Sequence, residues 1–404
     1  MFFLLSYSHR GVGFGPYHID LDVYRIGGQA WLHGEDLYGH LPATSAGARL
    51  PFTYPPVAAF LLAPFSLVPM AVAATVLTFA TIVLLAVALR VFLRRLTGPA
   101  AGSWWAIAWL LPAGLLLEPV RDTLGFGQVN VVLMALVSLD CLAETPRWPR
   151  GALVGLAAAV KLTPAAFVLF FLVRRDLRAA GTVACSFAAV AALGFAVAWH
   201  DSVQYWTGTA FQVSRAGGPG AASNQSILAI LARAGLGPHT PAAVAAWLAL
   251  SAVVVAFAWR RMSQALAAAE NCLALSLNAF AALLISPVSW SHHWAWCAPA
   301  VLTFTARGVS RRSRRLLAAG AAGLALFAAS PQFWIRPGWN ADVRWAVWQQ
   351  LVTSPYALFA ALILLLNCAA VSPVRSIPGS GSTPRAADVE PGDHGQLPAR
   401  RDKP

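Results

Sequence analysis

Long apolar runs separated by short polar stretches follow one another along most of the chain. A helix that crosses the hydrocarbon core of a membrane needs about 20 consecutive apolar residues, which is close to the length of these runs. The pattern predicts an all-α, polytopic integral membrane protein with about 10–12 transmembrane or re-entrant helices and no strands. We expect a juxtamembrane piece at 57–68 and helices at 71–93, 103–119, 126–143, 151–173, 179–199, 241–260, 267–286, 291–306, 315–330 and 353–371.

The composition supports a membrane protein. Of the 404 residues, 58% are hydrophobic and 11% are charged, and the mean hydropathy is +0.62. A soluble domain carries roughly 25% charged residues. The net charge is +13, but the arginines stand mainly at the ends of apolar runs. That distribution is the positive-inside pattern of membrane proteins, and it argues against nucleic-acid binding.

The arginine clusters orient the predicted helices, because short cytoplasmic loops are enriched in Lys and Arg. All clusters lie on the cytoplasmic side if segment 151–173 enters and leaves the membrane on the same side. Lys161 and Pro164 interrupt this segment with a charge and a helix breaker, as expected for two half-helices beside a cavity. The alternative is one ordinary span, with Arg174 and Arg175 outside.

With this topology, the outer side carries four segments, 8–56, 119–125, 200–240 and 331–350, and the turn Ser286–His293. Nearly every unusual polar residue lies there, which indicates an outward-facing site. The tail 372–404 is rich in Pro, Gly, Ser and Arg, and we expect it to be disordered and cytoplasmic. Residues 1–371 form the membrane domain in this prediction.

Asp20 and Asp22 place two carboxylates in the first outer segment of a chain in which charge is scarce. We expect residues 11–55 to form a polar, Gly- and aromatic-rich loop with short helices at the interface. On an extended stretch of this loop the two side chains would point in opposite directions, so both need not serve one site. Partial burial beside lipid raises the pKa of a carboxylate and suits a general base that takes a proton from an acceptor hydroxyl. The alternatives are loop capping, a salt bridge with Arg25, and Mg²⁺ binding by the Asp-x-Asp pair.

The turn from Ser286 to Trp294 is the second candidate, because His292 and His293 are adjacent there and flanked by tryptophans. The histidines are suited to donate hydrogen bonds to a phosphate or a sugar. Zinc is the rival ligand, but neighbouring helical side chains diverge by about 100° and chelate poorly. An interfacial aromatic belt is the other alternative. We expect neither a metal nor a cofactor.

Lys161 is an intramembrane lysine, which is a functional candidate because an unpaired charge is costly there. It either reaches the cytoplasmic surface or meets an anionic lipid group in the cavity. Two pairs of amides either bind sugar hydroxyls or cap helices. These pairs are Gln128 with Asn130, and Asn224 with Gln225.

Glu118, Arg121 and Asp122 cluster at an outer helix end. Arg121 either pairs internally with Glu118 or binds a donor phosphate, and Arg215 is a similar candidate. The sequence contains no Walker loop, GxSxG, HExxH or Rossmann fingerprint. This argues against a nucleotide-driven pump and against a cytosolic nucleotide-sugar enzyme.

Taken in order, several short motifs resemble those of glycosyltransferase family 87 of the GT-C superfamily. This group includes actinobacterial polyprenol-phosphate-mannose-dependent α-(1→2)-mannosyltransferases and related arabinofuranosyltransferases. The resemblance runs from residue 18 to residue 371, and the ordered series is more specific than any single motif. The motifs are Asp20-Leu21-Asp22-Val23-Tyr24, Leu37-Tyr38, Phe52-Thr53-Tyr54-Pro55-Pro56, Gly127-Gln128-Val129-Asn130, Gly155 to Lys161-Leu162-Thr163-Pro164, Asn224-Gln225-Ser226 and Ser286 to His293.

The resemblance implies an inverting transfer of mannose from a polyprenyl-phosphate donor to a glycolipid or lipoglycan acceptor, on the periplasmic side of the inner (plasma) membrane. The family's base falls on Asp20, with Asp22 at the variable position of the motif. The second of the family's paired histidines maps to His293. The departing phosphate would be stabilised by Lys161, His292, His293 or an arginine. The donor- and acceptor-binding residues expected in this way are Asp22, Tyr24, Tyr54, Arg121, Gln128, Asn130, Lys161, Asn224, Gln225, His292 and His293.

Two rival functions remain open at this point. One is an arabinofuranosyltransferase, which differs in pocket shape. The other is a transporter of lipid-linked sugar, although the repeat symmetry common in transporters is not visible. Members of the family begin with a full transmembrane helix before the first outer loop, whereas this chain has only Met1–Tyr7 there. We therefore expect the first transmembrane helix to be truncated.

Overall fold

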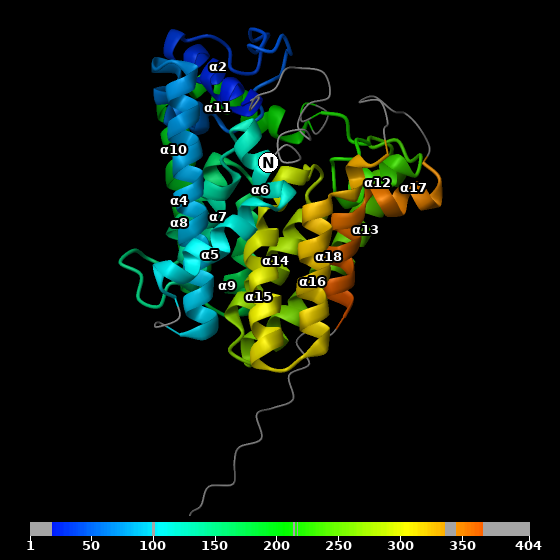
Figure 1. Cartoon of the computed structure of the whole chain (residues 1–404). Helices are drawn as coiled ribbons and strands as arrows, with labels where there is room; N and C mark the ends of the chain where they lie inside the picture. The colour runs from blue at the N-terminus through cyan, green and yellow to red at the C-terminus, as the bar shows by residue number, and fades with distance from the viewer. Residues whose placement is uncertain (1–17, 99–101, 213–214, 216, 336–344, 367–404) are drawn as a thin grey trace, which may run out of the picture. The chain divides into compact units, whose positions relative to one another are not determined.

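The computed structural model describes residues 18–98, 102–212, 215, 217–335 and 345–366, and Figure 1 shows how their helices are arranged. Within these ranges every regular element is helical, so the predicted all-α class is confirmed. Asn224 and Trp290 form an isolated antiparallel bridge. The segment before His18 and the predicted tail 372–404 lie outside the described residues.

The α-helices are α2 (Ile19–His33), α3 (Pro56–Leu62), α4 (Met70–Thr97), α5 (Trp104–Leu115), α6 (Glu118–Phe126), α7 (Asn130–Leu142), α8 (Ala152–Val160), α9 (Val168–Val173), α10 (Leu177–Val197), α11 (Trp199–Thr207), α12 (Ile227–Arg233), α13 (Pro241–Ala267), α14 (Asn271–Ile285), α15 (Cys297–Ser310), α16 (Arg314–Ala329), α17 (Val347–Thr353) and α18 (Pro355–Leu365). Short 3₁₀ helices are η1 (Ala63–Leu67), η2 (Thr163–Phe167), η3 (Thr209–Phe211), η5 (Ser291–Trp296) and η6 (Pro331–Phe333).

Among the residues that the structure describes, four helical stretches are long and apolar enough to cross a membrane: α4, α10, α13 and Arg314–Phe333, which contains α16 and η6. The number rises to six if each of two bent pairs counts as one span. α6 and α7 meet at 120°, and α17 and α18 at 84°. Shorter apolar helices accompany them, so the prediction of a polytopic membrane protein is confirmed, although many elements are shorter or more bent than ordinary spans.

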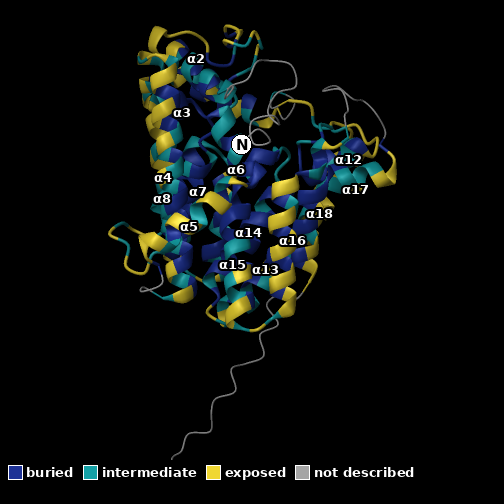
Figure 2. Cartoon of the chain, viewed as in Figure 1, coloured by how far each residue is buried: buried dark blue, intermediate teal, exposed yellow. Residues whose placement is uncertain are grey.

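Apolar side chains cover the outside of these helices, as expected where a protein contacts lipid. The most apolar windows of α10 and α13 are only 11% buried inside the protein, compared with 44% for α4. Trp105 and Trp109 on α5 are more than four-fifths exposed. Figure 2 shows buried residues in the interior and exposed residues on the outward surfaces of the helices. The peripheral helices are therefore the lipid-facing layer of a multi-pass membrane protein.

Segment 151–173 is not one continuous helix. α8 stops at Lys161, whose backbone is extended with φ −148° and ψ 127°, and the chain continues as η2 and α9. Pro164 near the start of η2 cannot donate a helical hydrogen bond. Arg150, before α8, binds carbonyl oxygens at the end of α7, and Arg174, after α9, lies within electrostatic range of Arg150. Both ends of the segment thus lie near each other, which agrees with the re-entrant prediction better than with a single span.

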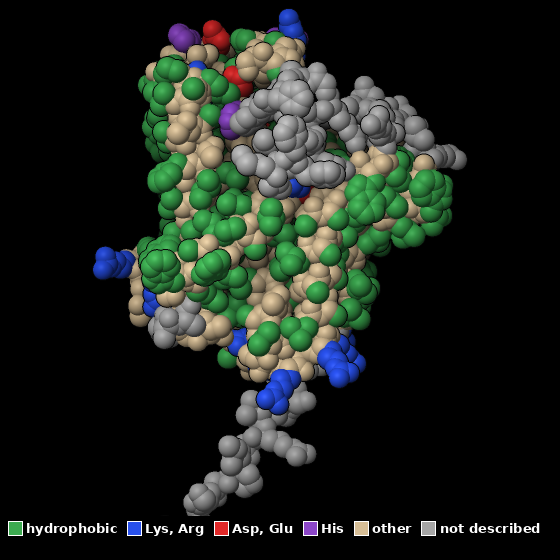
Figure 3. All heavy atoms as spheres, in the orientation of Figure 1, with side chains coloured by type: hydrophobic (Ala, Val, Ile, Leu, Met, Phe, Trp, Pro, Cys, Tyr) green, Lys and Arg blue, Asp and Glu red, His purple; other side chains and the backbone are tan. Residues whose placement is uncertain are grey.

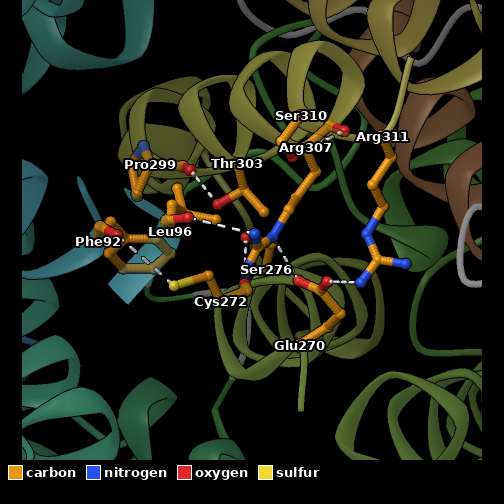
Figure 4. Close-up of polar contacts among 10 residues, drawn as sticks. All are labelled: Phe92, Leu96, Glu270, Cys272, Ser276, Pro299, Thr303, Arg307, Ser310 and Arg311. Atoms are coloured by element: carbon orange, nitrogen blue, oxygen red, sulfur yellow. Dashed lines mark hydrogen bonds and ion pairs between the residues drawn. The ribbon is translucent and has the colours of Figure 1, made fainter. Parts of the chain in front are cut away.

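Arginines predicted to be cytoplasmic gather at the lower end of the molecule in Figure 3. Arg307 pairs with the buried carboxylate of Glu270 at 2.6 Å and donates to the carbonyl oxygen of Leu96 at 3.2 Å. Arg311 pairs with the same carboxylate, and Figure 4 shows how these side chains join α4, α14 and α15. Cations near helix C-termini also interact favourably with the helix dipole. These arginines therefore hold helix ends together in addition to marking one side.

The predicted outer segments meet at the opposite end, around α2, α11, α12 and α17 in Figure 1. Hydrogen bonds of 2.7–3.1 Å between these segments join His18 to Gly125, Leu37 to Asp201, Gln225 to Ser289 and Trp345 to Arg233. The prediction that segments far apart in sequence form one polar end agrees with these contacts.

Some local predictions are wrong. Asp20 and Asp22 lie in helix α2 and not on an extended stretch, because Leu21, Tyr24 and Gly28 recur at helical spacing and are buried against the protein. α2 agrees with the short helices expected within 11–55. α13 continues to Ala267, beyond the predicted end at 260. α18 ends at Leu365, and residues 367–371 of the predicted helix lie outside the described residues. Packing against neighbouring helices decides where these helices end, and the sequence pattern does not show that packing.

Candidate active site

Helix α2 carries Asp20 in its first turn. The helix starts after His18, whose backbone is left-handed with φ 31° and whose N–H donates to the Gly125 carbonyl oxygen at 2.8 Å. Gly28 lets α2 approach η1 closely, because a Cβ at this position would lie 2.8 Å from the Cα of Ala63. These contacts fix the place of Asp20 relative to α6.

Asp20 and Asp22 face different surroundings. Asp22 accepts a hydrogen bond from the Ser45 N–H at 2.6 Å. Arg25 donates to carbonyl oxygens at the end of η1, and no ion pair among the described residues includes either aspartate. The expected salt-bridge alternative is therefore wrong. Asp22 anchors the loop that contains Ser45, whereas Asp20 faces the polar cluster described next.

Tyr24, Tyr54 and Gln128 form a closed ring of hydrogen bonds beside Asp20. The Tyr24 hydroxyl donates to Gln128 Oε1 at 2.8 Å, and Gln128 Nε2 donates to the Tyr54 hydroxyl at 3.3 Å. The two hydroxyls are 3.1 Å apart. Because Tyr24 gives its only proton to Gln128, Tyr54 donates to Tyr24. Burial, and then the charge of Asp20, raise the pKa of Tyr54, so its hydroxyl stays neutral.

Lys161 points into the same cluster. Its Nζ lies 2.8 Å from Asn130 Oδ1, 3.3 Å from His293 Nε2 and 3.5 Å from Gln128 Oε1. It also lies 5.5 Å from the centre of the Tyr54 ring. The break between α8 and η2 produces this placement, since Lys161 is the extended residue between them. Lys161 therefore does not reach toward the cytoplasmic end, and that alternative is wrong.

The two histidines have different roles. His292 is buried, packs its ring 5.3 Å from that of Phe126, and leaves Nε2 without a partner among the described residues. Its carbonyl oxygen accepts hydrogen bonds from Thr123 Oγ1 at 3.0 Å and Asn130 Nδ2 at 3.1 Å. The His293 ring is nearly perpendicular to it, at 83°, and faces Lys161. Thr123 was not singled out from the sequence, which contains no signal for its contact with a turn 169 residues away.

The pKa of Asp20 is raised to about 6. Burial is the main cause, and the amide of Gln128 and the positive charge of Lys161 act in the opposite direction. A carboxylate with such a pKa is largely ionised at neutral pH and is more basic than an exposed aspartate. The raised pKa that we expected for a carboxylate in this position is therefore present at Asp20.

A cavity of about 40 Å³ adjoins the cluster. Asn130 and His293 form a polar edge, and apolar side chains of α7, η2 and α14 form most of the remaining wall. Phe167 and Trp296 stack at 4.7 Å between ring centres and line it as well. The sequence analysis did not identify these two aromatics, because isolated aromatic residues in apolar helices usually belong to the core.

Asn224 and Gln225 are fully buried and bonded within the protein. Asn224 Oδ1 accepts the Ser289 N–H at 2.9 Å, and Gln225 Nε2 donates to the Thr353 carbonyl oxygen at 2.7 Å. Gln225 Oε1 accepts the Tyr356 N–H at 3.2 Å. These amides connect the outer loop to the histidine turn and to α18.

Arg121 lies on α6 beside Asp122, and within the described residues it forms no ion pair. The expected internal pair between Glu118 and Arg121 is not formed. Glu118 accepts a hydrogen bond from the Tyr356 hydroxyl at 2.6 Å instead. Arg215 donates to the Tyr38 carbonyl oxygen at 2.9 Å.

The cluster combines a carboxylate, an ammonium group and several neutral hydrogen-bond donors. Across the described part of the chain, no group of three or more His, Cys, Asp or Glu side chains is arranged to hold a metal ion. Asp20 with Lys161, Gln128, Asn130 and His293 is thus suited to proton transfer next to an anionic group.

The sequence profile described as glycosyltransferase family 87 matches residues 52–287. No solved structure matches the chain.

Three curated relatives are informative. Two carry the name polyprenol-phosphate-mannose-dependent alpha-(1-2)-phosphatidylinositol mannoside mannosyltransferase. The one from Mycobacterium tuberculosis is 40% identical over 385 residues, which cover 91% of this chain and 89% of that protein. The one from Mycolicibacterium smegmatis is 41% identical and covers 88% and 85%. A polyprenol-phosphate-mannose-dependent alpha-(1-2)-phosphatidylinositol pentamannoside mannosyltransferase from Mycobacterium tuberculosis is 35% identical, over 71% of this chain and 66% of that protein.

Proposed function

The chain belongs to glycosyltransferase family 87, and we propose that it transfers mannose from a polyprenyl-phosphate donor to a hydroxyl group of a phosphatidylinositol mannoside or a similar glycolipid. The names of the relatives support this donor and this acceptor, since the alignments cover most of both chains. The membrane-embedded fold suits substrates that are both anchored in lipid.

Asp20 acts as the general base in this proposal. Its carboxylate takes the proton of the acceptor hydroxyl while the acceptor oxygen attacks C1 of the mannose. The bond between C1 and the phosphate oxygen breaks, polyprenyl phosphate leaves with the electron pair, and a β-linked donor gives an α-linked product. The observation that carries this assignment is the position of Asp20, with its pKa of about 6, within electrostatic range of Lys161 and beside neutral hydroxyl and amide donors.

Lys161 stabilises the departing phosphate, and Asn130 and His293, which accept its N–H groups, hold the ammonium group in place. Negative charge grows on the leaving oxygen, and donors that are already in place stabilise this charge most effectively. Lys161 has three N–H donors, and its contact with Gln128, at 3.5 Å, is its longest. A phosphate oxygen can replace that contact at little cost. Tyr24, Tyr54 and Gln128 keep the base and the cation apart and orient the sugar hydroxyls.

The remaining predicted residues separate into two groups. Asp22, Asn224 and Gln225 shape the site through buried contacts with the backbone and do not bind sugar directly. Arg121, without an ion pair in the described chain, is available for the phosphate of an acceptor lipid. His292 supports the turn that carries His293.

In this proposal the reaction takes place on the outer face of the inner membrane. Support comes from Lys and Arg side chains at the lower end of the molecule in Figure 3, opposite α2 in Figure 1, since such clusters mark the cytoplasmic side under the positive-inside rule. The small cavity beside Asn130 and His293 has a mostly apolar wall formed by α7, η2 and α14, which suits apolar atoms of the donor next to the phosphate.

A transfer assay in membranes tests the proposal. Polyprenyl-phosphate mannose and polyprenyl-phosphate arabinose are offered separately with a phosphatidylinositol mannoside acceptor, to wild type, Asp20→Asn and the matched control Asp22→Asn. We expect transfer of mannose only, with a loss of about 10²–10⁴-fold in Asp20→Asn and a smaller effect in Asp22→Asn. Near wild-type activity of Asp20→Asn would refute the assignment of the base. Use of neither donor by wild type would refute the function.

A further inference from the structure

Glu118 and Asp122 on α6 form a second pair of carboxyl groups, which the proposed reaction does not use. They are four residues apart and therefore lie on one face of the helix. Glu118 is 1% exposed and Asp122 is partly buried, and the two carboxyl groups lie within hydrogen-bonding range of each other. Neither pairs with a Lys, Arg or His of the described chain.

Two ionised carboxylates cannot make this contact. A carboxylate has no hydrogen-bond donor, and two negative charges repel strongly in a buried environment. The two oxygens of Glu118 also differ, since Oε2 accepts from the Tyr356 hydroxyl at 2.6 Å while Oε1 is buried without a conventional partner. A proton on Oε1 that is donated to Asp122 satisfies this oxygen and removes the repulsion.

We propose that Glu118 and Asp122 share one proton as a carboxylic acid–carboxylate pair, and that this pair positions the Ser291–His293 turn. Glu118 holds α18 through Tyr356, and Asp122 Oδ2 accepts from the Ser291 hydroxyl at 3.5 Å. Ser291 begins η5, the 3₁₀ helix that contains His293.

The surroundings of the pair favour one negative charge and not two. The groups that face it are the Tyr356 hydroxyl from α18, the Ser291 hydroxyl from η5 and the Cys297 thiol from α15. On α6 itself, Arg121 is adjacent to Asp122. We therefore place the proton on Glu118, which is deeper, and the charge on Asp122, which is nearer to the arginine.

Substitution of either carboxyl group by a neutral amide distinguishes a pair that shares one proton from a pair of ionised carboxylates. In Glu118→Gln the amide N–H donates to Asp122 and the amide oxygen accepts from Tyr356, so both hydrogen bonds survive. Asp122→Asn is tolerated for the same reason, because protonated Glu118 donates to the amide oxygen. Glu118→Leu keeps an apolar volume but removes both hydrogen bonds.

The kinetic part of the test rests on the proposed transfer reaction. We expect both amide variants to retain kcat/KM within about threefold, whereas Glu118→Leu loses about 10–100-fold, because small displacements of catalytic groups have effects of this size. The loss falls on kcat more than on the KM for the donor. Full activity of Glu118→Leu, or Glu118→Gln as inactive as Glu118→Leu, overturns the positioning role.

Infrared difference spectroscopy at neutral pH tests the shared proton without an activity readout. Wild type minus Glu118→Gln should show the C=O stretching band of a protonated, buried carboxylic acid, and this band should persist in Asp122→Asn. Absence of the band refutes the shared proton. This test does not use Glu118→Leu, so it decides the question even if that variant does not fold. If wild type uses neither donor, the proposed function fails, while the band still decides whether the pair holds a proton.

Discussion

The pH dependence of transfer is the most direct consequence of the geometry around Asp20. The carboxylate acts as a base only when it is ionised, so activity should fall as pH decreases through its pKa of about 6. With that pKa, about 91% of Asp20 is ionised at pH 7 and about 9% at pH 5, which corresponds to a loss of about tenfold in kcat/KM. An exposed aspartate, with a pKa of about 4, would lose little over the same range.

Substitution of Lys161 provides a second test, because it should shift the acidic limb of the same pH–rate profile. Its positive charge favours the ionised form of Asp20 and lowers the pKa of that carboxyl against the effect of burial. In Lys161→Met the proton should be held more tightly, so the acidic limb should move to higher pH. The maximal rate should fall as well, but the pH at the midpoint of the acidic limb is measured independently of the maximal rate.

The assay follows initial rates of mannose transfer in membrane vesicles between about pH 5 and about pH 8, the range in which the carboxyl titrates. Asp22→Asn is the matched control, because its side chain binds the Ser45 N–H and should leave the limb in place. Stability at each pH is checked by returning samples to neutral pH before a second measurement. A profile without an acidic limb near pH 6, or a limb unchanged in Lys161→Met, would refute the reasoning.

Three further predictions concern stability and metal dependence. Asp140→Ala should lower the free energy of unfolding by about 1–3 kcal/mol, measured by thermal denaturation in detergent, because the buried carboxylate accepts the N–H groups of Gly151 and Val154 at the start of α8; unchanged stability would contradict its capping role. Gly28→Ala should destabilise by about 1–3 kcal/mol because the added methyl group meets the Ala63 backbone, and an unchanged melting temperature would show that α2 can shift freely. Transfer should survive treatment with EDTA, whereas loss that Mg²⁺ restores would reveal a metal site.

The sequence alone was sufficient to predict a membrane protein and the order of most of its helices along the chain. Apolar runs near the length of a bilayer and arginines at their ends are local signals, so they predict helices and orientation without knowledge of contacts. The break at Lys161 and Pro164 was also predictable, because a charge and a proline interrupt a helix wherever it packs. Asp20 stood out since carboxylates are scarce in this chain.

The tertiary structure decided which polar residues act together. Asp20 and Lys161 are separated by 141 positions, and only the packing of α2, α6 and η5 around the broken segment brings them to one cluster. The same packing turned Asn224 and Gln225, attractive ligands in the sequence, into buried supports. Long-range contacts of this kind depend on which faces of the helices meet, and hydrophobic periodicity shows that a face is buried without showing its partner.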